Sequence, residues 1–215
     1  AQSSQRAASS IMSFVRGAAA LVGVGLSAQA ILQSADAYTV LQNKLQNVSD
    51  SERQVTELTN ELFNVANKTR TPAQETAQAF TRFDMALKNL GKSQQDSLRL
   101  TETVNKMLVV SGATSTEAGS ALLQLSQAFN KGKLDGDEFR SVMELMPNAA
   151  DAIAKRLGVT RGELLKLAPQ GKITAQVMVD AFNDAAKGID EKFGKTVPTL
   201  SQAMTVLKNN ATQTL

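Results

Sequence analysis

Three side chains that could bind a metal ion lie close together in the sequence, at Asp135, Asp137 and Glu138. Their spacing differs from that of an EF-hand loop, in which alternating loop positions supply the calcium ligands. All three fall in the expected first turn of a helix, where negative charge interacts favourably with the helix dipole. We therefore interpret the cluster as a helix start and expect no bound metal.

Other reactive side chains are scarce. The sequence contains no Cys and no His, which removes thiol nucleophiles, imidazole bases, disulfides and nearly all zinc sites. Catalysis would depend on Asp, Glu, Lys, Ser or Tyr, and no nucleophile has an identifiable activating partner. The GKLDG sequence at Gly132 does not match a phosphate-binding P-loop. We expect no enzymatic activity, no catalytic residues and no cofactor.

Residues 152–172 (AIAKRLGVTRGELLKLAPQGK) have the small, apolar and turn residues of a helix-turn-helix. In a DNA-binding protein the second helix would present Arg161, Glu163 and Lys166 to the groove. This set is poor in hydrogen-bond donors, and the Glu163 carboxylate would repel phosphate. Two packed short helices explain the pattern more simply, and a helix-turn-helix nucleic-acid-binding protein is the alternative.

The charge of the chain is nearly balanced. The 23 basic residues oppose 20 acidic ones, which leaves a formal net charge of +3 at pH 7. No stretch concentrates positive charge as a dedicated DNA-binding arm does. We therefore expect no sequence-specific contact with nucleic acid.

An apolar segment occupies residues 11–32, and its only charged residue is Arg16. We expect a long apolar helix here, with a small-residue face on which two helices can approach closely. This face consists of Ala19, Gly23 and Ser27. The uncharged residues 17–32 would extend roughly 24 Å as a helix, short of the membrane span that about 20 residues provide. Packing on the domain or on other copies is one interpretation, and a transient membrane contact is the other.

Helix start and stop signals alternate along the rest of the chain. In a capping box, Ser or Thr and a Glu or Gln three residues later satisfy backbone N–H groups at a helix start. This spacing occurs at Ser51/Gln54, Thr71/Gln74, Thr114/Glu117 and Thr160/Glu163, with a weaker variant at Asp135/Glu138 and a simple cap at Thr174. Glycines suited to helix ends are Gly91, Gly112, Gly132, Gly158, Gly171 and Gly188.

Between these signals, apolar residues recur at helical spacing, and no convincing alternating strand is present. The sequence therefore predicts an all-α fold, a compact multi-helix domain of about nine short-to-medium helices with a long apolar N-terminal helix. The helix-turn-helix-like pair is one part of this domain. A last helix would carry Leu200, Met204, Leu207 and Ala211 on one face.

Several long stretches resemble the N-terminal domain of phage and prophage tail tape measure proteins. The most telling are residues 122–147 (LLQLSQAFNKGKLDGDEFRSVMELMP), 157–174 (LGVTRGELLKLAPQGKIT), 98–114 (LRLTETVNKMLVVSGAT) and 67–83 (NKTRTPAQETAQAFTRF). The resemblance covers roughly residues 35–190. It divides the chain into an apolar N-terminal helix at 1–34, the tape measure domain at 35–190, and a C-terminal connecting helix at 191–215 that leads toward a downstream region.

The resemblance implies a structural protein of the virion that sets tail length and scaffolds the tail tube, lies in the tube lumen, and leaves ahead of the DNA. Its implied partners are other copies of itself, the tail tube protein, tail assembly chaperones, tail tip proteins and, transiently, the host membrane. Before assembly it would reside in the host cytoplasm. A wall-degrading enzyme domain, which some tape measure proteins carry, would need paired carboxylates lining a cleft.

Within the resembling region, two groups of residues receive expected roles. Candidate contacts with a partner are Gln124, Gln127 and Arg140. Residues expected to shape turns, helix ends and the core are Gly132, Gly136, Phe139, Pro147 and Gly158.

Overall fold

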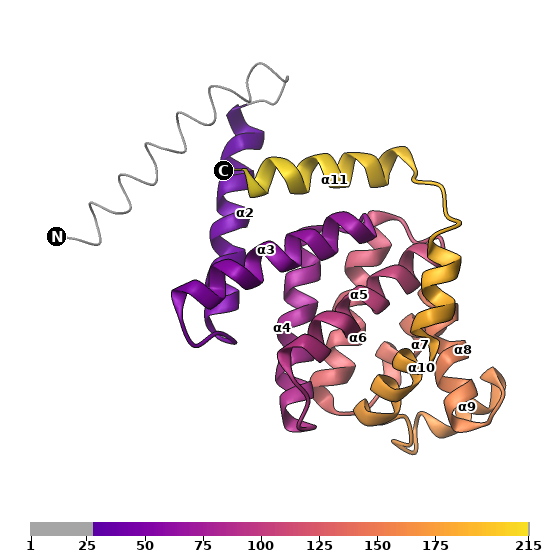
Figure 1. Cartoon of the computed structure of the whole chain (residues 1–215). Helices are drawn as coiled ribbons and strands as arrows, with labels where there is room; N and C mark the ends of the chain where they lie inside the picture. Colours follow the sequence, from indigo (N-terminus) through magenta and orange to yellow (C-terminus); the bar gives the residue numbers. More distant parts are fainter. Residues whose placement is uncertain (1–27, 215) are drawn as a thin grey trace.

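A computed structural model of the protein describes residues 28–214, which fold into helices joined by short turns (Figure 1). The helices in this range are α2 (Ala28–Gln46), α3 (Glu52–Thr69), α4 (Ala73–Asn89), α5 (Gln94–Val110), α6 (Ser115–Lys131), α7 (Gly136–Leu145), α8 (Pro147–Leu157), α9 (Arg161–Leu167), α10 (Ala175–Phe193) and α11 (Leu200–Gln213). An all-α fold is therefore confirmed for the described residues. Most of the predicted apolar N-terminal helix lies outside them.

Local hydrogen bonds start several helices as the sequence predicts. Thr114 and Thr160 form complete capping boxes at the starts of α6 and α9. Ser51 caps α3 through its hydroxyl alone, since the Gln54 side chain accepts instead from the N–H of the preceding residue. Thr174 caps α10. Each bond satisfies a backbone donor that has no partner within the helix.

Three predicted signals are wrong, and in two of them the side chain makes a different contact. Thr71 does not cap α4, whose N-cap is Pro72, because the Thr71 hydroxyl is bonded within a buried polar cluster. Asp135 precedes α7 but makes no cap bond, since its carboxylate pairs with two nearby lysines. Gly188 lies inside α10 rather than at its end.

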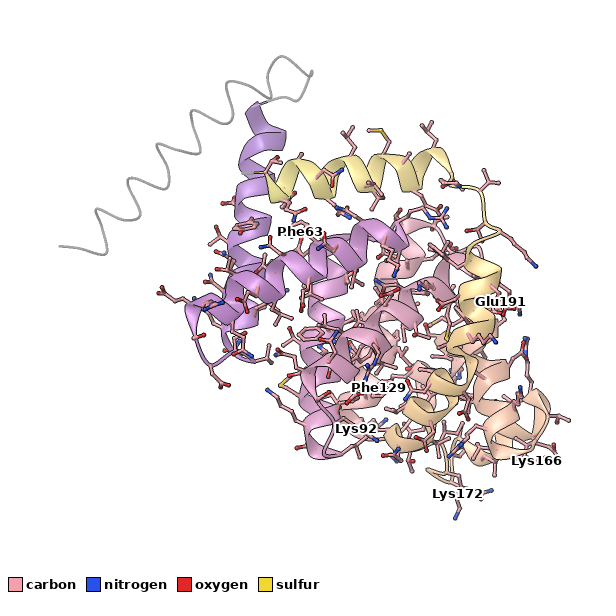
Figure 2. The ribbon with its side chains drawn as sticks, in the orientation of Figure 1. Phe63, Lys92, Phe129, Lys166, Lys172 and Glu191 are labelled. Carbon is pink, nitrogen blue, oxygen red and sulfur yellow. The ribbon has the colours of Figure 1, made fainter. Side chains whose placement is uncertain are left out.

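The buried apolar residues form two cores that share α4. Phe63 and Phe80 belong to the first core, between α2, α3 and one side of α4. Phe83, one turn further along α4, belongs to the larger second core and meets the Phe129 ring edge-on at 4.9 Å between centroids. Figure 2 shows Phe63 and Phe129 in these separate regions. Helix α4 thus contributes to both cores, and α5 also reaches the first core through Leu98.

The last helix, α11, lies across α2 and α3 and also touches α6 (Figure 1). The C-terminal end of α11 lies beside the N-terminal half of α2, so both ends of the described chain are at one corner of the domain. Among residues 28–214, no helix is long and apolar enough to span a membrane.

Candidate assembly surface

The last helix turns its apolar side chains outward. Four large apolar residues on α11 and the linker before it, here called the apolar stripe, are exposed. They are Val197, Leu200, Met204 and Leu207, with 85%, 81%, 56% and 48% of their surface accessible. The residues that α11 buries are Gln202, Asn209, Ala211 and Thr212. A surface helix normally buries its apolar face. α11 instead exposes its large apolar side chains and buries mostly polar ones.

The apolar stripe has the spacing of a helix-pairing seam. Its three members on α11, Leu200, Met204 and Leu207, are separated by four and three residues, as are the apolar positions of a coiled coil. Side chains project from the outer side of α11, away from the rest of the domain (Figure 2). The sequence predicts Leu200, Met204, Leu207 and Ala211 on one face, but the structure buries Ala211 and exposes the other three. Periodicity alone does not say which way such a face points.

Asn209 determines the orientation of α11. Its side chain is buried, and its Oδ1 accepts from the backbone N–H of Ala73 at 3.0 Å. Its Nδ2 donates to the carbonyl oxygen of Thr71 at 2.8 Å. Both partners lie at the start of α4, where backbone groups lack partners within the helix. Rolling α11 to bury the stripe would break both bonds, and each group left without a partner costs about 1–3 kcal/mol.

Further polar contacts hold the inner side of α11 along its length. Asn67 Nδ2 donates to Asn210 Oδ1 at 2.7 Å, and the hydroxyls of Ser115 and Thr205 lie 3.0 Å apart. Thr199 forms a capping box that starts the helix, a start that our sequence analysis did not identify. All these groups are neutral, so the contacts do not depend on ionisation.

A buried amide supports the α4 start to which α11 is bound. Asn105 on α5 is fully buried, and its Nδ2 lies 3.2, 2.8 and 3.1 Å from the hydroxyls of Thr69, Thr71 and Thr76. These hydroxyls belong to the end of α3, the turn, and the first part of α4. The cluster therefore joins three helices beneath the docking point of Asn209.

The turn between α3 and α4 also binds the linker that leads to α11. Arg70 at the end of α3 has a left-handed backbone conformation, with φ 58°. Its guanidinium carbon lies 4.5 Å from the centroid of the Phe193 ring, and its Nη2 donates to the Thr196 hydroxyl. Burial lowers the pKa of Arg70 from its usual value. The domain therefore binds the chain both before α11, through Arg70, and within α11, through Asn209.

An ion cluster joins α5 to α10 next to this linker. Lys106 Nζ lies 2.5 Å from Glu102 Oε1 and 2.6 Å from Asp190 Oδ1. Burial disfavours the charged ammonium, but the hydrogen bonds to Asp190 and Glu102 outweigh burial and raise the pKa of Lys106. Burial likewise acts against the Glu102 carboxylate, yet its bonds to Lys106 and Lys68 lower its pKa. The contact between α5 and α10 therefore depends on charged groups, whereas the contacts of α11 depend on neutral ones.

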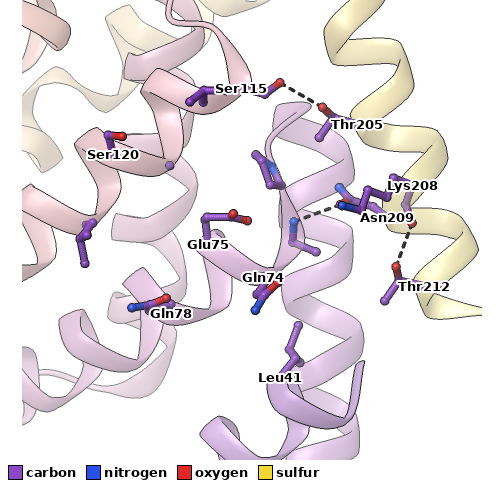
Figure 3. Close-up of a pocket in the computed structure, with 15 residues that line it drawn as sticks. Leu41, Gln74, Glu75, Gln78, Ser115, Ser120, Thr205, Lys208, Asn209 and Thr212 are labelled. Carbon is purple, nitrogen blue, oxygen red and sulfur yellow. Dashed lines mark hydrogen bonds between the residues drawn. The ribbon is translucent and has the colours of Figure 1, made fainter. Parts of the chain in front are cut away.

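A groove of about 700 Å³ lies between α11, α4 and α6 (Figure 3). Glu75 is the one carboxylate among its lining residues, and it lies with Gln74 and Gln78 on the α4 side. Glycosidic hydrolysis generally uses a pair of carboxylates, which this groove does not contain. The groove therefore does not resemble the cleft that a wall-degrading enzyme requires.

The helix-turn-helix-like pair consists of α8 and the short α9. Arg161, its expected DNA contact, binds the Asp151 carboxylate and the carbonyl oxygen of Pro147. The Glu163 carboxylate is held in the capping box of Thr160. Both side chains are therefore occupied by contacts within the pair, while Lys166 is exposed at the edge of the domain (Figure 2).

The three expected partner contacts lie apart from the apolar stripe. Gln124 is half-buried and Gln127 is exposed, both on α6. Arg140 is exposed on α7 and pairs with Asp137 at 3.3 Å. The structure brings none of the three together with the α11 surface. The residues of the expected self-association face, Ala19, Gly23 and Ser27, lie outside the described residues.

The five residues expected to shape the domain lie at helix boundaries or in the core. Gly132 and Gly158 end α6 and α8 in the left-handed conformation, with φ 81° and 67°. Gly136 is the first residue of α7, and Pro147 is the first residue of α8. Phe139 is buried in the second core. Within residues 28–214 no group of three or more acidic side chains is arranged to hold a metal ion.

The tape measure protein family matches residues 29–215, most of the chain. The chain belongs to the tape measure protein family. It is therefore a structural protein of the phage tail and virion, as the resemblance predicted, and the family is not a class of enzymes. No curated protein and no solved structure was found to match the chain.

Proposed function

We propose that this tape measure protein sets the length of the phage tail and scaffolds polymerisation of the tail tube around itself. The match of the family over residues 29–215 carries this proposal. The physical basis is that a helix advances about 1.5 Å per residue, so that chain length converts linearly into distance. Residues 35–190 would form the tape measure domain, with 1–34 serving assembly or membrane contact and 191–215 leading toward a downstream rod.

The two ends of the described chain mark where a rod would be attached to this domain. The start of α2 and the end of α11 lie at one corner (Figure 1), so that chain on either side would leave the domain from the same place. The proposed location is the lumen of the tail tube, reached from the host cytoplasm during assembly, with release during DNA ejection. The proposed partners are other copies, tube protein, assembly chaperones and tail tip proteins.

The ruler function is tested by changing the length of the parent gene. An in-frame insertion of about 70 helical residues after residue 215 should lengthen the tail by about 105 Å. Electron microscopy of purified virions measures the tail length. A deletion of the same size is the matched control and should shorten the tail equally. Unchanged tail length in both variants would contradict the proposal.

The nucleic-acid alternative finds less support in the same structure. Its expected recognition residues, Arg161 and Glu163, are bound within the α8–α9 pair. A duplex-binding protein should bind with a steep dependence on salt concentration. Absence of duplex binding by the full chain at about 50 mM salt would remove this alternative.

A further inference from the structure

We infer that the groove between α8 and α10 in one copy of this chain binds the first part of α3 in a second copy. The groove has a volume of about 680 Å³ and is lined by residues of α8 and α10. Three lysines, Lys155, Lys187 and Lys192, are among its lining residues, and we call it the basic groove. This contact specifies the self-association proposed above, and it does not depend on the ruler function.

The three lysines carry charge that the domain does not neutralise. All three are exposed, and within residues 28–214 no carboxylate lies at ion-pair distance from any of them. Two carboxylates that line the groove are already paired, Asp184 with Arg156 and Asp151 with Arg161. The third, Glu191, has no such partner among the described residues. The groove therefore presents excess positive charge, which favours an acidic occupant.

Small residues line the groove between these charged side chains. Ala152, Ala181 and Ala185 contribute methyl groups, and Gly188 contributes no side chain. A Cβ atom on Gly188 would meet no heavy atom within 4 Å, and its φ is not positive. A glycine inside a helix is less stable than an alanine, and no contact within residues 28–214 requires a glycine here. The close approach of a helix from outside the domain accounts for it.

A complementary acidic surface lies at the start of α3. Its exposed carboxylates, here called the acidic end, are those of Asp50, Glu52, Glu57 and Glu61. Of these four, Glu57 alone is in an ion pair, with Arg53, and both side chains of that pair are largely exposed. Such surface pairs are weak. Glu57 and Glu61 are one helical turn apart and therefore project from the same face.

The acidic end and the basic groove lie on opposite sides of one copy, so they pair between copies. Figure 1 shows the turn between α2 and α3 at one side of the domain and α8 and α9 at the other. A contact between two different patches of identical chains is head-to-tail and allows further copies to add. Because both complementary surfaces belong to this chain, a second copy is favoured over an unrelated acidic protein.

Charge reversal in the full chain tests the contact, with sedimentation velocity as the measurement. Wild type should self-associate at about 50 mM salt and up to about 100 µM protein, and high salt should weaken the association. Lys187→Glu with Lys192→Glu, or Glu57→Lys with Glu61→Lys, should each raise the Kd about tenfold or more, because like charges then face each other. An equal mixture of the two variants should associate again, because each reversed surface then meets a complementary one.

The matched control is Lys166→Glu with Lys172→Glu. It makes the same change of charge at two exposed lysines outside the groove (Figure 2), and should leave the Kd within about twofold because salt screens distant charges. A wild type that stays monomeric would overturn the inference, as would variants that associate like wild type or a mixture that does not recover. Duplex DNA binding by a monomeric wild type, lost on reversal of Lys187 and Lys192, would assign these lysines to nucleic acid and overturn it as well.

Gly188 supplies a test that leaves the charge unchanged. Gly188→Ala should raise the melting temperature, because alanine stabilises a helix interior. Gly188→Leu should raise the Kd about tenfold by filling the groove. Asn183→Leu, at an exposed position of α10 outside the groove, is the control and should leave association unchanged. Circular dichroism checks that each variant is folded. Unchanged association of the Gly188→Leu variant would contradict the placement of α3 in the groove, whatever the tail-length experiment shows.

Discussion

The two C-terminal helices, α10 and α11, follow each other in the chain but pack on the domain differently: α10 through apolar side chains and α11 mainly through polar ones. α10 buries Met178, Phe182 and Ile189 in the large core. α11 buries the amides of Gln202 and Asn209, the hydroxyl of Thr212 and one small apolar residue, Ala211, and leaves its leucines and Met204 exposed. The first is bound to the domain by removal of apolar surface from water, whereas the second is bound mainly by hydrogen bonds to backbone ends and polar side chains.

The difference means that α10 stabilises the fold, whereas α11 keeps an apolar surface exposed. Burial of apolar side chains is strong and has no required direction, so α10 contributes to the fold itself. Hydrogen bonds are directional and add only about 0.5–1.5 kcal/mol each to stability. They hold α11 in one orientation while leaving its apolar side free for another segment. Four measurements would break or sharpen this comparison.

The largest difference should appear between two methionines. Met178→Ala in α10 should reduce the free energy of unfolding by about 2–5 kcal/mol, because it leaves a cavity in the core. Met204→Ala in α11 should cost at most about 1 kcal/mol, since its side chain is largely exposed. Urea denaturation followed by circular dichroism measures both. Equal losses would show that α11 is part of the core after all.

Two neighbouring asparagines test the attachment of α11. Asn209→Ala should destabilise the docked helix by roughly 1–3 kcal/mol, because it leaves the Ala73 N–H and the Thr71 carbonyl without partners. Asn210→Ala removes one exposed bond and is the matched control. Hydrogen exchange in α11 measures the local opening. Similar exchange in both variants would refute the role given to Asn209.

Removing the capping box of α6 should destabilise the whole domain, whereas removing that of α11 should destabilise α11 alone. Thr114→Ala and Thr199→Ala each remove a cap worth about 1 kcal/mol. The Thr114 variant should lower the melting temperature, because α6 contributes to the second core. The Thr199 variant should instead increase exchange in α11, with little change in the melting temperature. A global effect of the Thr199 change would contradict the separation of α11 from the core.

The smallest expected effect depends on pH. Glu102 in the ion cluster has a folded pKa below its ordinary 4.5, so its contribution to stability is complete above that value and is lost as the pH falls through the folded pKa. α11 contains no carboxylate, and its polar contacts are neutral. Lowering the pH from about 6 to about 3 should therefore loosen the ion cluster of Glu102, Lys106 and Lys68 before α11.

Backbone amide exchange at the two pH values measures this order of opening. Glu102→Gln is the control, because it removes one of the two carboxylates that bind Lys106 and should weaken the dependence of the ion cluster on pH in that range. If α11 opened first in acid, its attachment would have to involve charged groups that the structure does not show.

Short-range features could be predicted because their partners lie within the same few residues. The boxes at Thr114 and Thr160 join positions three residues apart, and the helical class follows from apolar periodicity. The family could be identified for the same reason, since long ordered stretches of the sequence carry the resemblance. The failure at Thr71 has the opposite cause, because its hydroxyl is bonded to Asn105, 34 residues away.

The amino-acid sequence by itself determined that the last helix has an apolar face, since Leu200, Met204 and Leu207 recur at helical spacing. Only the tertiary structure decided that this face points away from the domain. The deciding contact joins Asn209 to the start of α4, 136 residues earlier in the chain. Periodicity records which side chains share a face, but the direction of that face depends on which distant backbone groups lack partners.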